Sequence, residues 1–356
     1  MVNGSSGSTA AYLLGGTSAG AAGLAIGPGT PATSATVDNY GTIKGFYGVD
    51  LAAGLTGATL TDAGSIIGTG GTAALFGGGN DFVVLHPGAV FDGIVQAGGS
   101  AAGDTLELAP GTAGAVGTLA GLGSSFTNFG ASAIEAGADW TLNGSNTAGT
   151  GTTLTNDGTL AIDGTLAAYG SLINNGGITI GGTAGRSIRA VGATANNYGS
   201  IVAGGTAGAI ALYGGTLTNA GTAKIEGAAY GILATSSNVT IDNAGTIGAT
   251  GSSGIGITVL TSGTVTNAGT ISGSGGTALA FGQYAGRVVL DPGAAFGGIV
   301  QGGSSATGTL ELAVGDGAVG TLGGLGTSFT NFASVVVDIR PATRWNWRPA
   351  TATSVR

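Results

Sequence analysis

The sequence has no cysteine and a single histidine, His86. A chain without cysteine can form no disulfide framework, no thiolate metal site and no cysteine nucleophile. One histidine is too few for a histidine-based metal cluster. From these two absences we expect neither a bound metal nor a cofactor, and we expect packing and hydrogen bonds to supply the stability of the fold.

Charge is also scarce, and basic charge most of all. Lys and Arg together number 9 against 17 Asp and Glu, which gives a net charge of −8. No basic stripe is available to meet phosphates, so the sequence argues against nucleic-acid binding. There is also no run of about 18 apolar residues, so we expect no membrane insertion by this chain.

What the sequence has in abundance is glycine, which occupies 77 of 356 positions. Much of it falls in register within one pattern, which reads Thr, aliphatic, polar, Asn, any residue, Gly, small, aliphatic. Regular placement of this kind indicates folded repeats rather than a disordered low-complexity chain. The eight copies of the pattern are residues 36–43, 59–66, 153–160, 171–178, 194–201, 216–223, 240–247 and 264–271.

The pattern predicts a short strand with one buried face. In the copy at 216–223, Thr216, Leu217 and Thr218 alternate polar and apolar, so Leu217 should point inward. Asn219 should then point inward at the end of the strand. A buried amide needs partners, and identical amides one strand spacing apart can hydrogen-bond to each other as a ladder. The expected ladder positions are Asn39, Asp62, Asn156, Asn174, Asn197, Asn219, Asn243 and Asn267.

A glycine follows two residues after each ladder position. Only glycine takes a positive φ without steric cost, so this column predicts a sharp turn of fixed geometry. The final aliphatic residue of the pattern starts a second strand, and residues 47–51, 230–233 and 256–259 show a third. The glycine column consists of Gly41, Gly64, Gly158, Gly176, Gly199, Gly221, Gly245 and Gly269.

The spacing of the copies predicts how they stack. From residue 174 onward the ladder positions are 174, 197, 219, 243 and 267, so the steps are 23, 22, 24 and 24 residues. This period fits one coil of a solenoid. We therefore predict an all-β fold, a right-handed parallel β-helix of about 14 coils with three short strands per coil of about 22–24 residues.

A longer module is duplicated within the repeats. Residues 59–135 recur as 264–338, and the match includes His86-Pro87-Gly88 against Asp291-Pro292-Gly293. We expect the module to add three coils to the same solenoid, with Asn128 and Asn331 as degenerate ladder positions. The predicted organisation is a Gly/Ala/Ser-rich segment or frayed first coil at 1–35, a solenoid at 36–338 and an atypical tail at 339–356. The tail holds four of the nine basic residues, two of the three Trp and no Gly, so we expect it to stand outside the repeats as a truncated, frame-shifted or unrelated segment.

Two stretches carry a family resemblance: Thr-Val-Thr-Asn-Ala-Gly-Thr-Ile-Ser-Gly at 264–273, and the segment from Gly78-Gly79-Asn80-Asp81 to Leu106-Glu107-Leu108. Both resemble the passenger domains of bacterial autotransporters, the type V secreted proteins of Gram-negative bacteria. The resemblance covers about residues 36–338. It implies a right-handed β-helix that is displayed on the cell surface or released from it, with glycans or proteins of a host or surface as partners.

Family members leave the cell through a C-terminal membrane β-barrel. Nothing after residue 338 shows the alternating segments of about ten residues that a barrel requires. Residues 1–8 lack the basic start and apolar stretch of a secretory leader. We therefore expect a barrel translocator in the full-length form, and an export leader outside this chain if the protein is exported.

Candidate sites are weak. Residues 16–20 match the nucleophile-elbow pattern G-x-S-x-G, but a glycine-rich chain produces that match by chance. Gly79-Asn80-Asp81 is similar to a calcium-binding repeat, which needs tandem copies, and the duplicate has 284–286 in its place. We predict no catalytic, cofactor-binding or metal residue, and a non-enzymatic structural stalk or adhesin.

Two alternatives remain. β-Helices also host polysaccharide lyases and glycosidases, which need clustered acids; here the acids are dispersed, as shown by Asp38, Asp50, Asp92, Asp104, Asp163, Glu226 and Asp242. The minor alternative is an ice-binding surface, because outward threonines form columns, although Thr is also a good outward strand residue. The columns are Thr36, Thr59, Thr153, Thr194, Thr216, Thr240 and Thr264, and beside them Thr61, Thr155, Thr218 and Thr266, interrupted by Ile173, Asn196 and Asp242.

Overall fold

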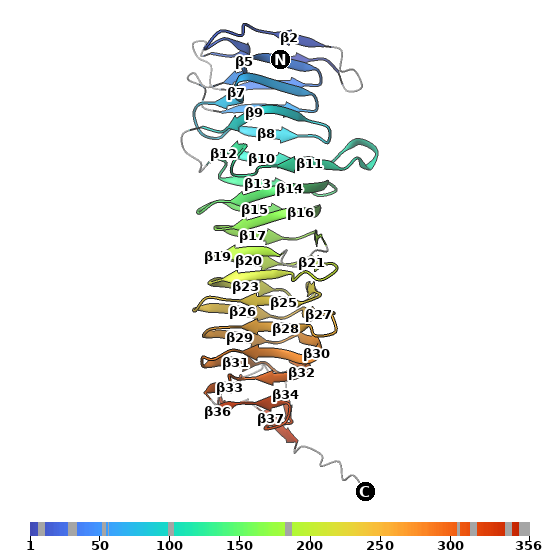
Figure 1. Ribbon diagram of the computed structural model, residues 1–356, viewed down its shortest axis with the longest axis vertical. Coiled ribbons are helices and arrows are strands. Elements are labelled where there is room, and N and C mark those ends of the chain that lie inside the picture. Colours follow the sequence, from blue (N-terminus) through green and yellow to red (C-terminus); the bar gives the residue numbers. More distant parts are fainter. Residues whose placement is uncertain are drawn as a thin grey trace. The chain divides into compact units, whose positions relative to one another are not determined.

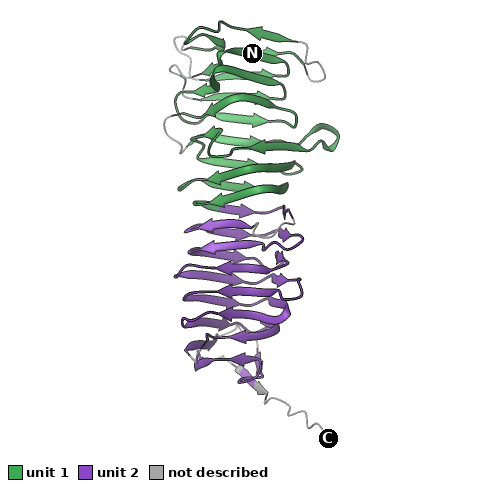
Figure 2. Cartoon of the chain, viewed as in Figure 1, with its two compact units in different colours: residues 1–171 green, residues 172–356 purple. Residues whose placement is uncertain are grey.

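The computed structural model describes residues 1–5, 11–27, 34–51, 55, 57–98, 103–181, 187–304, 307–313, 319–338 and 344–348. The fold is an all-β parallel β-solenoid of about 13 turns, with 63% of residues in strands and 1% helical. The predicted parallel β-helix is thereby confirmed. The chain divides into two compact units, residues 1–171 and 172–356 (Figure 2), which are described in turn.

In unit 1 the first strand of each coil lies in one parallel sheet, stacked in sequence order (Figure 1). The register places equivalent repeat positions side by side, so Val37 pairs with Leu60 and Asn39 with Asp62. The strands are β1 (Val2–Asn3), β4 (Ala35–Asn39), β6 (Ala58–Asp62), β8 (Phe82–Leu85), β10 (Thr105–Leu108), β13 (Ala131–Ile134) and β15 (Thr153–Asn156).

The second and third strands of a coil are often one continuous strand in unit 1. In β7 (Ser65–Phe76) the buried residues change face across an exposed middle, where Gly71 has a φ of 94°. The other long strands are β5 (Thr42–Leu51), β9 (Val90–Gln96), β14 (Asp139–Ala148) and β16 (Thr159–Ala168). Shorter elements are β2 (Tyr12–Leu14), β3 (Ala22–Ala25), β11 (Gly117–Ala120), β12 (Phe126–Thr127) and the 3₁₀ turn η2 (Thr112–Gly114).

Unit 2 shows the predicted three short strands per coil most clearly. Its first strands are β20 (Thr194–Asn197), β23 (Gly215–Asn219), β26 (Val239–Asn243), β29 (Gly263–Asn267), β31 (Gly286–Leu290), β33 (Gly308–Leu312) and β36 (Phe332–Val337), and β17 (Ser171–Asn174) falls at the boundary between the units in the sequence. Second strands are β18 (Gly177–Ile180), β21 (Ser200–Ala203), β24 (Lys224–Gly227) and β27 (Thr246–Ala249). Third strands are β19 (Ile188–Val191), β22 (Ile210–Tyr213), β25 (Tyr230–Ala234) and β28 (Ile255–Val259); β30 (Thr270–Phe281) joins both faces, and β32 (Ala295–Gln301), β34 (Val319–Gly323), β35 (Phe329–Thr330) and β37 (Arg344–Arg348) complete the unit.

The core of each unit is a column of aliphatic side chains. Leu60 and Ile66 in unit 1, and Leu217, Ile247 and Val265 in unit 2, have no exposed surface. Each occupies one of the two aliphatic positions of the repeat pattern. Burying such a side chain stabilises the fold by roughly 1.5–3 kcal/mol, and the repeat places such side chains in successive coils.

The glycine column differs from its prediction. Neither Gly64 nor Gly245 has a positive φ. Instead, a Cβ at Gly64 would overlap the carbonyl oxygen of Gly41 in the preceding coil, and one at Gly245 would overlap that of Ala220. Gly221 is the exception, since a Cβ there would meet nothing within 4 Å. Close approach between coils, rather than the conformation of the turn, is therefore what requires glycine.

The degenerate ladder positions predicted at Asn128 and Asn331 are wrong, whereas Asp62 and Asn267, at the start of the two module copies, are confirmed. Residues Phe126 and Thr127 form β12, which pairs with β9 rather than with a first strand, and Asn128 follows with a φ of 66°; Asn331 has a φ of 60°. The residues in register with Asp62 are Leu85, Leu108 and Ile134. A period-2 pattern identifies a strand but not the face of the solenoid on which the strand lies, so the short Ser-Phe-Thr-Asn segment was assigned to the wrong face.

The segments at both ends of the chain take part in strand pairing. β1 pairs with β4, and both β2 and β3 pair with β5, so parts of residues 1–35 form a first coil. In the tail, which the sequence predicts to stand outside the repeats, β37 pairs with β34 in parallel. The remaining tail residues, 339–343 and 349–356, lie outside the described part of the chain.

Candidate functional site

The buried amides form ladders within each unit. In unit 2, Asn174 donates to Asn197 at 2.7 Å, and Asn197 donates to Asn219, Asn219 to Asn243 and Asn243 to Asn267, each at 2.8 Å. All five side chains are at most 2% exposed. Each Nδ2 also reaches a backbone carbonyl, so the buried donors are satisfied. These residues stabilise the stack and are not available to a ligand.

Unit 1 has a shorter ladder that starts earlier than the sequence indicates. Asn3 donates to Asn39 at 2.8 Å, and Asn39 donates to the carboxyl oxygen Oδ1 of Asp62 at 2.6 Å. Asn3 was missed because β1 has two residues and no recognisable repeat pattern around it. Burial raises the pKa of Asp62 to about 7, against the opposing effect of the Asn39 and Gly64 hydrogen bonds.

The segment at Gly79-Asn80-Asp81, which is similar to a calcium-binding repeat, contributes hydrogen bonds between coils. Asp81 accepts from the backbone N–H of Ala58 at 2.7 Å, and Asp104 accepts from the N–H of Asp81 at 2.9 Å. Both acids are 1% exposed, and burial raises the pKa of Asp81 to about 6. In the described part of the chain no group of three or more His, Cys, Asp or Glu residues is placed to hold a metal ion.

The nucleophile-elbow match lacks the context that the pattern requires. Residues 18–20 form a turn between β2 and β3, where the N–H of Ala21 donates to the carbonyl of Ser18 at 3.0 Å. A nucleophile elbow places the serine between a strand and a helix. Here a second strand follows the turn in place of a helix, so the local structure gives Ser18 no activation.

One pair of acids does come together. Burial raises the pKa of Glu107, and so do repulsion by Glu135 and a hydrogen bond between the two side chains. The sequence did not indicate this pair because the residues lie in successive coils and in different repeat positions. In the second module Glu311 stands in place of Glu107, and it binds Arg287 instead.

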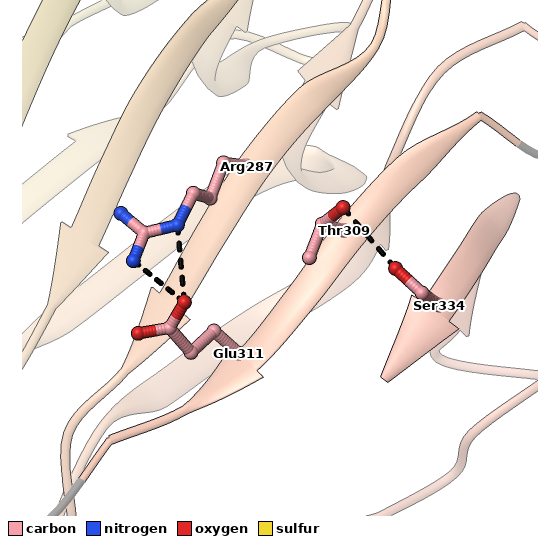
Figure 3. A network of polar contacts seen from close by, with 4 residues as sticks. All are labelled: Arg287, Thr309, Glu311 and Ser334. Carbon is pink, nitrogen blue, oxygen red and sulfur yellow. Dashed lines mark hydrogen bonds and ion pairs between the residues drawn. The ribbon is translucent and has the colours of Figure 1, made fainter. Parts of the chain in front are cut away.

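In unit 2 the outward threonine columns lie on the first strands of the coils, and they are interrupted there. Thr216, Thr240 and Thr264 are in register, but the next position is Arg287. Its guanidinium forms an ion pair with Glu311 of the next coil (Figure 3), in which Nε and Nη2 donate to the carboxylate oxygen Oε2 at 3.1 Å and 2.6 Å. An exposed ion pair of this kind stabilises by about 0–1 kcal/mol, and it replaces the regular hydroxyl spacing of the columns.

The same face continues from the ion pair into a hydroxyl pair. Ser334 donates to the hydroxyl oxygen of Thr309 at 3.2 Å, also between successive coils (Figure 3). A shallow hollow of about 510 Å³ lies on this face, and its lining includes Thr240, Thr264, Arg287 and Thr309. Around this hollow the outer face of unit 2 is thus polar and irregular rather than a uniform threonine array.

Each copy of the duplicated module contains a pocket lined by aromatic residues. In unit 1 its volume is about 560 Å³, and it lies between β9 and β11 above Trp140. Phe91 and Phe126 line it and meet edge to face, with ring centroids 5.6 Å apart. Ile94, also in the lining, is 41% exposed.

The second module repeats this pocket in unit 2. Its volume is about 480 Å³, and it lies between β32 and β34 beside Trp345. Phe296 and Phe329 take the places of the two phenylalanines, again edge to face at 5.6 Å. Ile299, in the place of Ile94, is 43% exposed. We define these cavities as the first and second module pockets.

A tryptophan supports each pocket in the same way, and it is buried in unit 1 (Trp140) and half-buried in unit 2 (Trp345). The indole N–H of Trp140 donates to the carbonyl of Ala109 at 2.9 Å, and that of Trp345 donates to Ala313 at 3.0 Å. Trp140 pairs with Gly117, where a Cβ would lie 2.5 Å from the indole ring. Trp345 has the same relationship to its partner Gly320, at 2.6 Å.

Burial of Asp291 and repulsion by Asp242 raise the pKa of Asp291, which lines the second module pocket. Among the described residues, no Lys or Arg lines either module pocket. Sequence reasoning missed both pockets, although the paired recurrence of Phe91, Phe126 and Trp140 at equivalent places in the second module was the available signal.

Comparison of the chain with protein-family models, with curated proteins and with solved structures found no match. Among the described residues no helix is long and apolar enough to cross a membrane. Residue chemistry and geometry therefore carry the functional argument.

Proposed function

We propose that this chain is an autotransporter passenger-type β-solenoid, displayed on or secreted from a Gram-negative cell, and that it acts as a structural stalk or adhesin rather than as an enzyme. The observation that carries the proposal is the stacking of near-identical coils through in-register ladders within each unit. A solenoid held by neighbour contacts extends by adding coils and presents a long outer surface. That architecture supports a display role, and the resemblance of the repeats to passenger domains supplies the cellular setting.

The outer surface suits weak, polar recognition. Small hydroxyl side chains dominate the outward columns, and the net charge is −8. We therefore propose glycans or proteins of a host or cell surface as partners, and neither nucleic acid nor membrane insertion by this chain. In the full-length form a barrel translocator would follow this chain.

The alternative class, a carbohydrate-active enzyme, has one observation in its favour, which is the Glu107–Glu135 pair. Glycosidases hold their two carboxyl groups about 5–10 Å apart, so that a sugar and a water or nucleophile fit between them. Carboxyl groups that hydrogen-bond directly leave no such space. Neither residue lines the module pockets.

Display on a cell surface tests the proposal. The chain should be fused between a secretory leader and an autotransporter barrel, and cells carrying it should bind glycan-coated or protein-coated surfaces more strongly than cells carrying the barrel alone. Added protease should remove both the chain and the gain in adhesion. Failure of the chain to reach the surface in this fusion, or display without any gain in adhesion and without extension from the cell, would contradict the passenger role.

The enzyme alternative is tested on purified protein. We expect no reducing ends and no unsaturated products from a panel of polysaccharides. Cleavage that Glu107→Gln abolishes, while leaving the circular dichroism spectrum unchanged, would overturn the non-enzymatic proposal. The minor ice-binding alternative predicts thermal hysteresis, which we do not expect because the Arg287–Glu311 pair and Asp242 interrupt the threonine columns.

A further inference from the structure

The module pockets lie where the stacking of strands is broken. In unit 1, one edge of β9 pairs with β7 along the length of β9. At the opposite edge of β9, the described residues that pair are only Val95 and Gln96, with β12. β11 pairs with β14 and is the last strand of its sheet. Neither the segment 90–92 nor β11 therefore has a described strand partner on the side that faces the pocket.

Unit 2 repeats the same break. β32 pairs with β30, while on its other side β35 covers Val300 and Gln301. β34 pairs with β37 in a sheet of two strands. The two modules share this topology although their loops differ in sequence, so the break belongs to the module rather than to one irregular coil.

Each pocket thus combines two features. Residues from both open strands line it: Phe91, Gly93 and Ile94 with Thr118 and Leu119 in unit 1. An open strand edge offers backbone N–H and C=O groups in a row, which is the template for adding another strand. The aromatic lining offers an apolar recess for the side chains of whatever pairs there.

We propose that the two module pockets are equivalent docking sites for an extended peptide segment of a partner protein, which adds as a strand to an open edge and places an aliphatic side chain against the phenylalanine pair. A small apolar molecule would fill the recess but would leave the backbone groups of the edges unpaired. A peptide pairs with the backbone groups of an open edge and also fills the apolar recess with a side chain. The described lining residues include no Lys or Arg, and the second pocket includes the acid Asp291, which favours a neutral or basic segment.

This site goes beyond the proposed function, because strand addition does not depend on where the protein is located. It also specifies the ligand more closely than an adhesive surface would. The preferred segment should alternate small or polar residues with Val or Ile, as the solenoid's own second strands do in β27, where Ile247 is inward between Thr246 and Gly248. Two equivalent sites on one chain would also allow bivalent capture of a repetitive partner.

The experiment uses the full chain and a capped octapeptide in which Thr and Val alternate between terminal lysines. Calorimetry should give two peptides per chain. Ile94→Ser should lower the affinity of the first site at least tenfold and leave one peptide per chain, Ile299→Ser should do the same at the second, and the double variant should bind none. Leu260→Ser is the control, because Leu260 is an aliphatic residue of similar exposure, 47%, that lines neither pocket; this variant should still bind two peptides per chain.

A chemical control separates strand addition from apolar uptake. The same peptide with N-methyl groups at alternate residues keeps its side chains but loses the N–H groups along one edge, and its affinity should fall at least tenfold. Equal binding of the methylated peptide, or binding of toluene where the peptide does not bind, would overturn strand addition and leave an apolar-molecule pocket.

Hydrogen exchange gives a readout that needs no variant. Bound peptide should slow amide exchange in 90–94 and 117–120, and in 295–299 and 319–323, while the ladder strands of unit 2 stay unchanged. Protection that appears elsewhere, or a stoichiometry of two that neither isoleucine substitution alters, would also overturn the assignment.

Discussion

The side-chain amide of Asn219 donates to the side-chain oxygen of Asn243 at 2.8 Å, one coil further on and 24 residues away in sequence. The same amide also reaches the carbonyl of Thr246 at 3.2 Å, and Asn219 itself accepts from Asn197. One side chain therefore joins three successive coils. Because such contacts are repeated, the loss of one should loosen neighbours before distant coils.

Asn219→Leu should destabilise unit 2 by several kcal/mol. The change leaves the amide of Asn197 without its acceptor and the oxygen of Asn243 without its donor, and each unsatisfied buried group costs about 1–3 kcal/mol. Hydrogen exchange should rise around residues 195–250. Urea unfolding supplies the change in free energy.

Thr218→Val is the matched control for the ladder. Thr218 is adjacent to Asn219 but points outward, where it is half-buried beside Asp242. Its replacement should change the free energy of unfolding by no more than about 0.5 kcal/mol. If both variants exchange alike, the assignment of inward and outward positions is wrong.

The glycine column offers a second matched pair. Gly245→Ala should destabilise unit 2 by about 1–3 kcal/mol, because the new methyl group would overlap the carbonyl oxygens of Ala220 and Ala223. Gly221→Ala meets open space and should be neutral or stabilise by about 0.4–1 kcal/mol through the unfolded chain. Equal effects of the two substitutions on urea unfolding would argue that backbone freedom, and not the approach of coils, requires glycine.

The repeat period was enough to predict the coils, their parallel stacking and the inward amides. These features depend on spacing, which a sequence displays directly, and Asn197, Asn219 and Asn243 illustrate it because each lies 22–24 residues from the next. The geometry of the turns was not predictable from residue type. A glycine is consistent either with a positive φ or with a close neighbour, and only the packed coils show that the neighbour decides at Gly64 and Gly245.

The module pockets form where neighbouring strands do not pair, and no local sequence pattern predicts which strands these are. Gly117 pairs with Trp140 and Gly320 with Trp345, over 23 and 25 residues, with loops of different length between them. The tail looks foreign in sequence because its arginines and its lack of glycine obscure the pairing of Gly320 with Trp345, which matches that of Gly117 with Trp140. The pairing of β12 with β9 was hidden for a different reason, since a two-residue strand has no period.

Trp345 should matter for the stability of unit 2 even though it lies in the atypical tail. Trp345→Phe removes the hydrogen bond to the carbonyl of Ala313 and should cost about 1 kcal/mol. Trp345→Ala also removes the ring beside Gly320, and because Trp345 is half-buried it should cost more than Trp345→Phe but less than the about 3–5 kcal/mol of a fully buried tryptophan. Urea unfolding followed by circular dichroism measures both, and a tail that contributes nothing would show no loss for either variant.

The remaining prediction concerns pH. Burial raises the pKa of Asp62 to about 7, whereas an aspartate in an unfolded chain titrates near 3.9. The folded state therefore binds the proton more tightly than the unfolded state. The contribution of this group to stability is fully present below about pH 4 and is lost as pH rises through about 7. Unit 1 should consequently become more stable as the pH falls from 8 to 5.

Asp62→Asn should remove the share of this dependence that Asp62 contributes, while the smaller share of Asp81, whose pKa burial raises to about 6, should remain. The ladder position is Asn in the neighbouring coil, and an amide there can still accept from Asn39 while carrying no charge. At pH 8 the variant should be more stable than the wild type by up to about 4 kcal/mol, a limit set by roughly three pKa units at 1.36 kcal/mol each. At pH 4 the two should converge. Urea unfolding across this range measures the difference, with Asp92→Asn, at an exposed position, as the control that should leave the slope unchanged. A wild type that loses stability on acidification from pH 8 to 5, together with an Asp62→Asn variant no more stable at pH 8, would show that the buried carboxyl is charged and well solvated in the ladder.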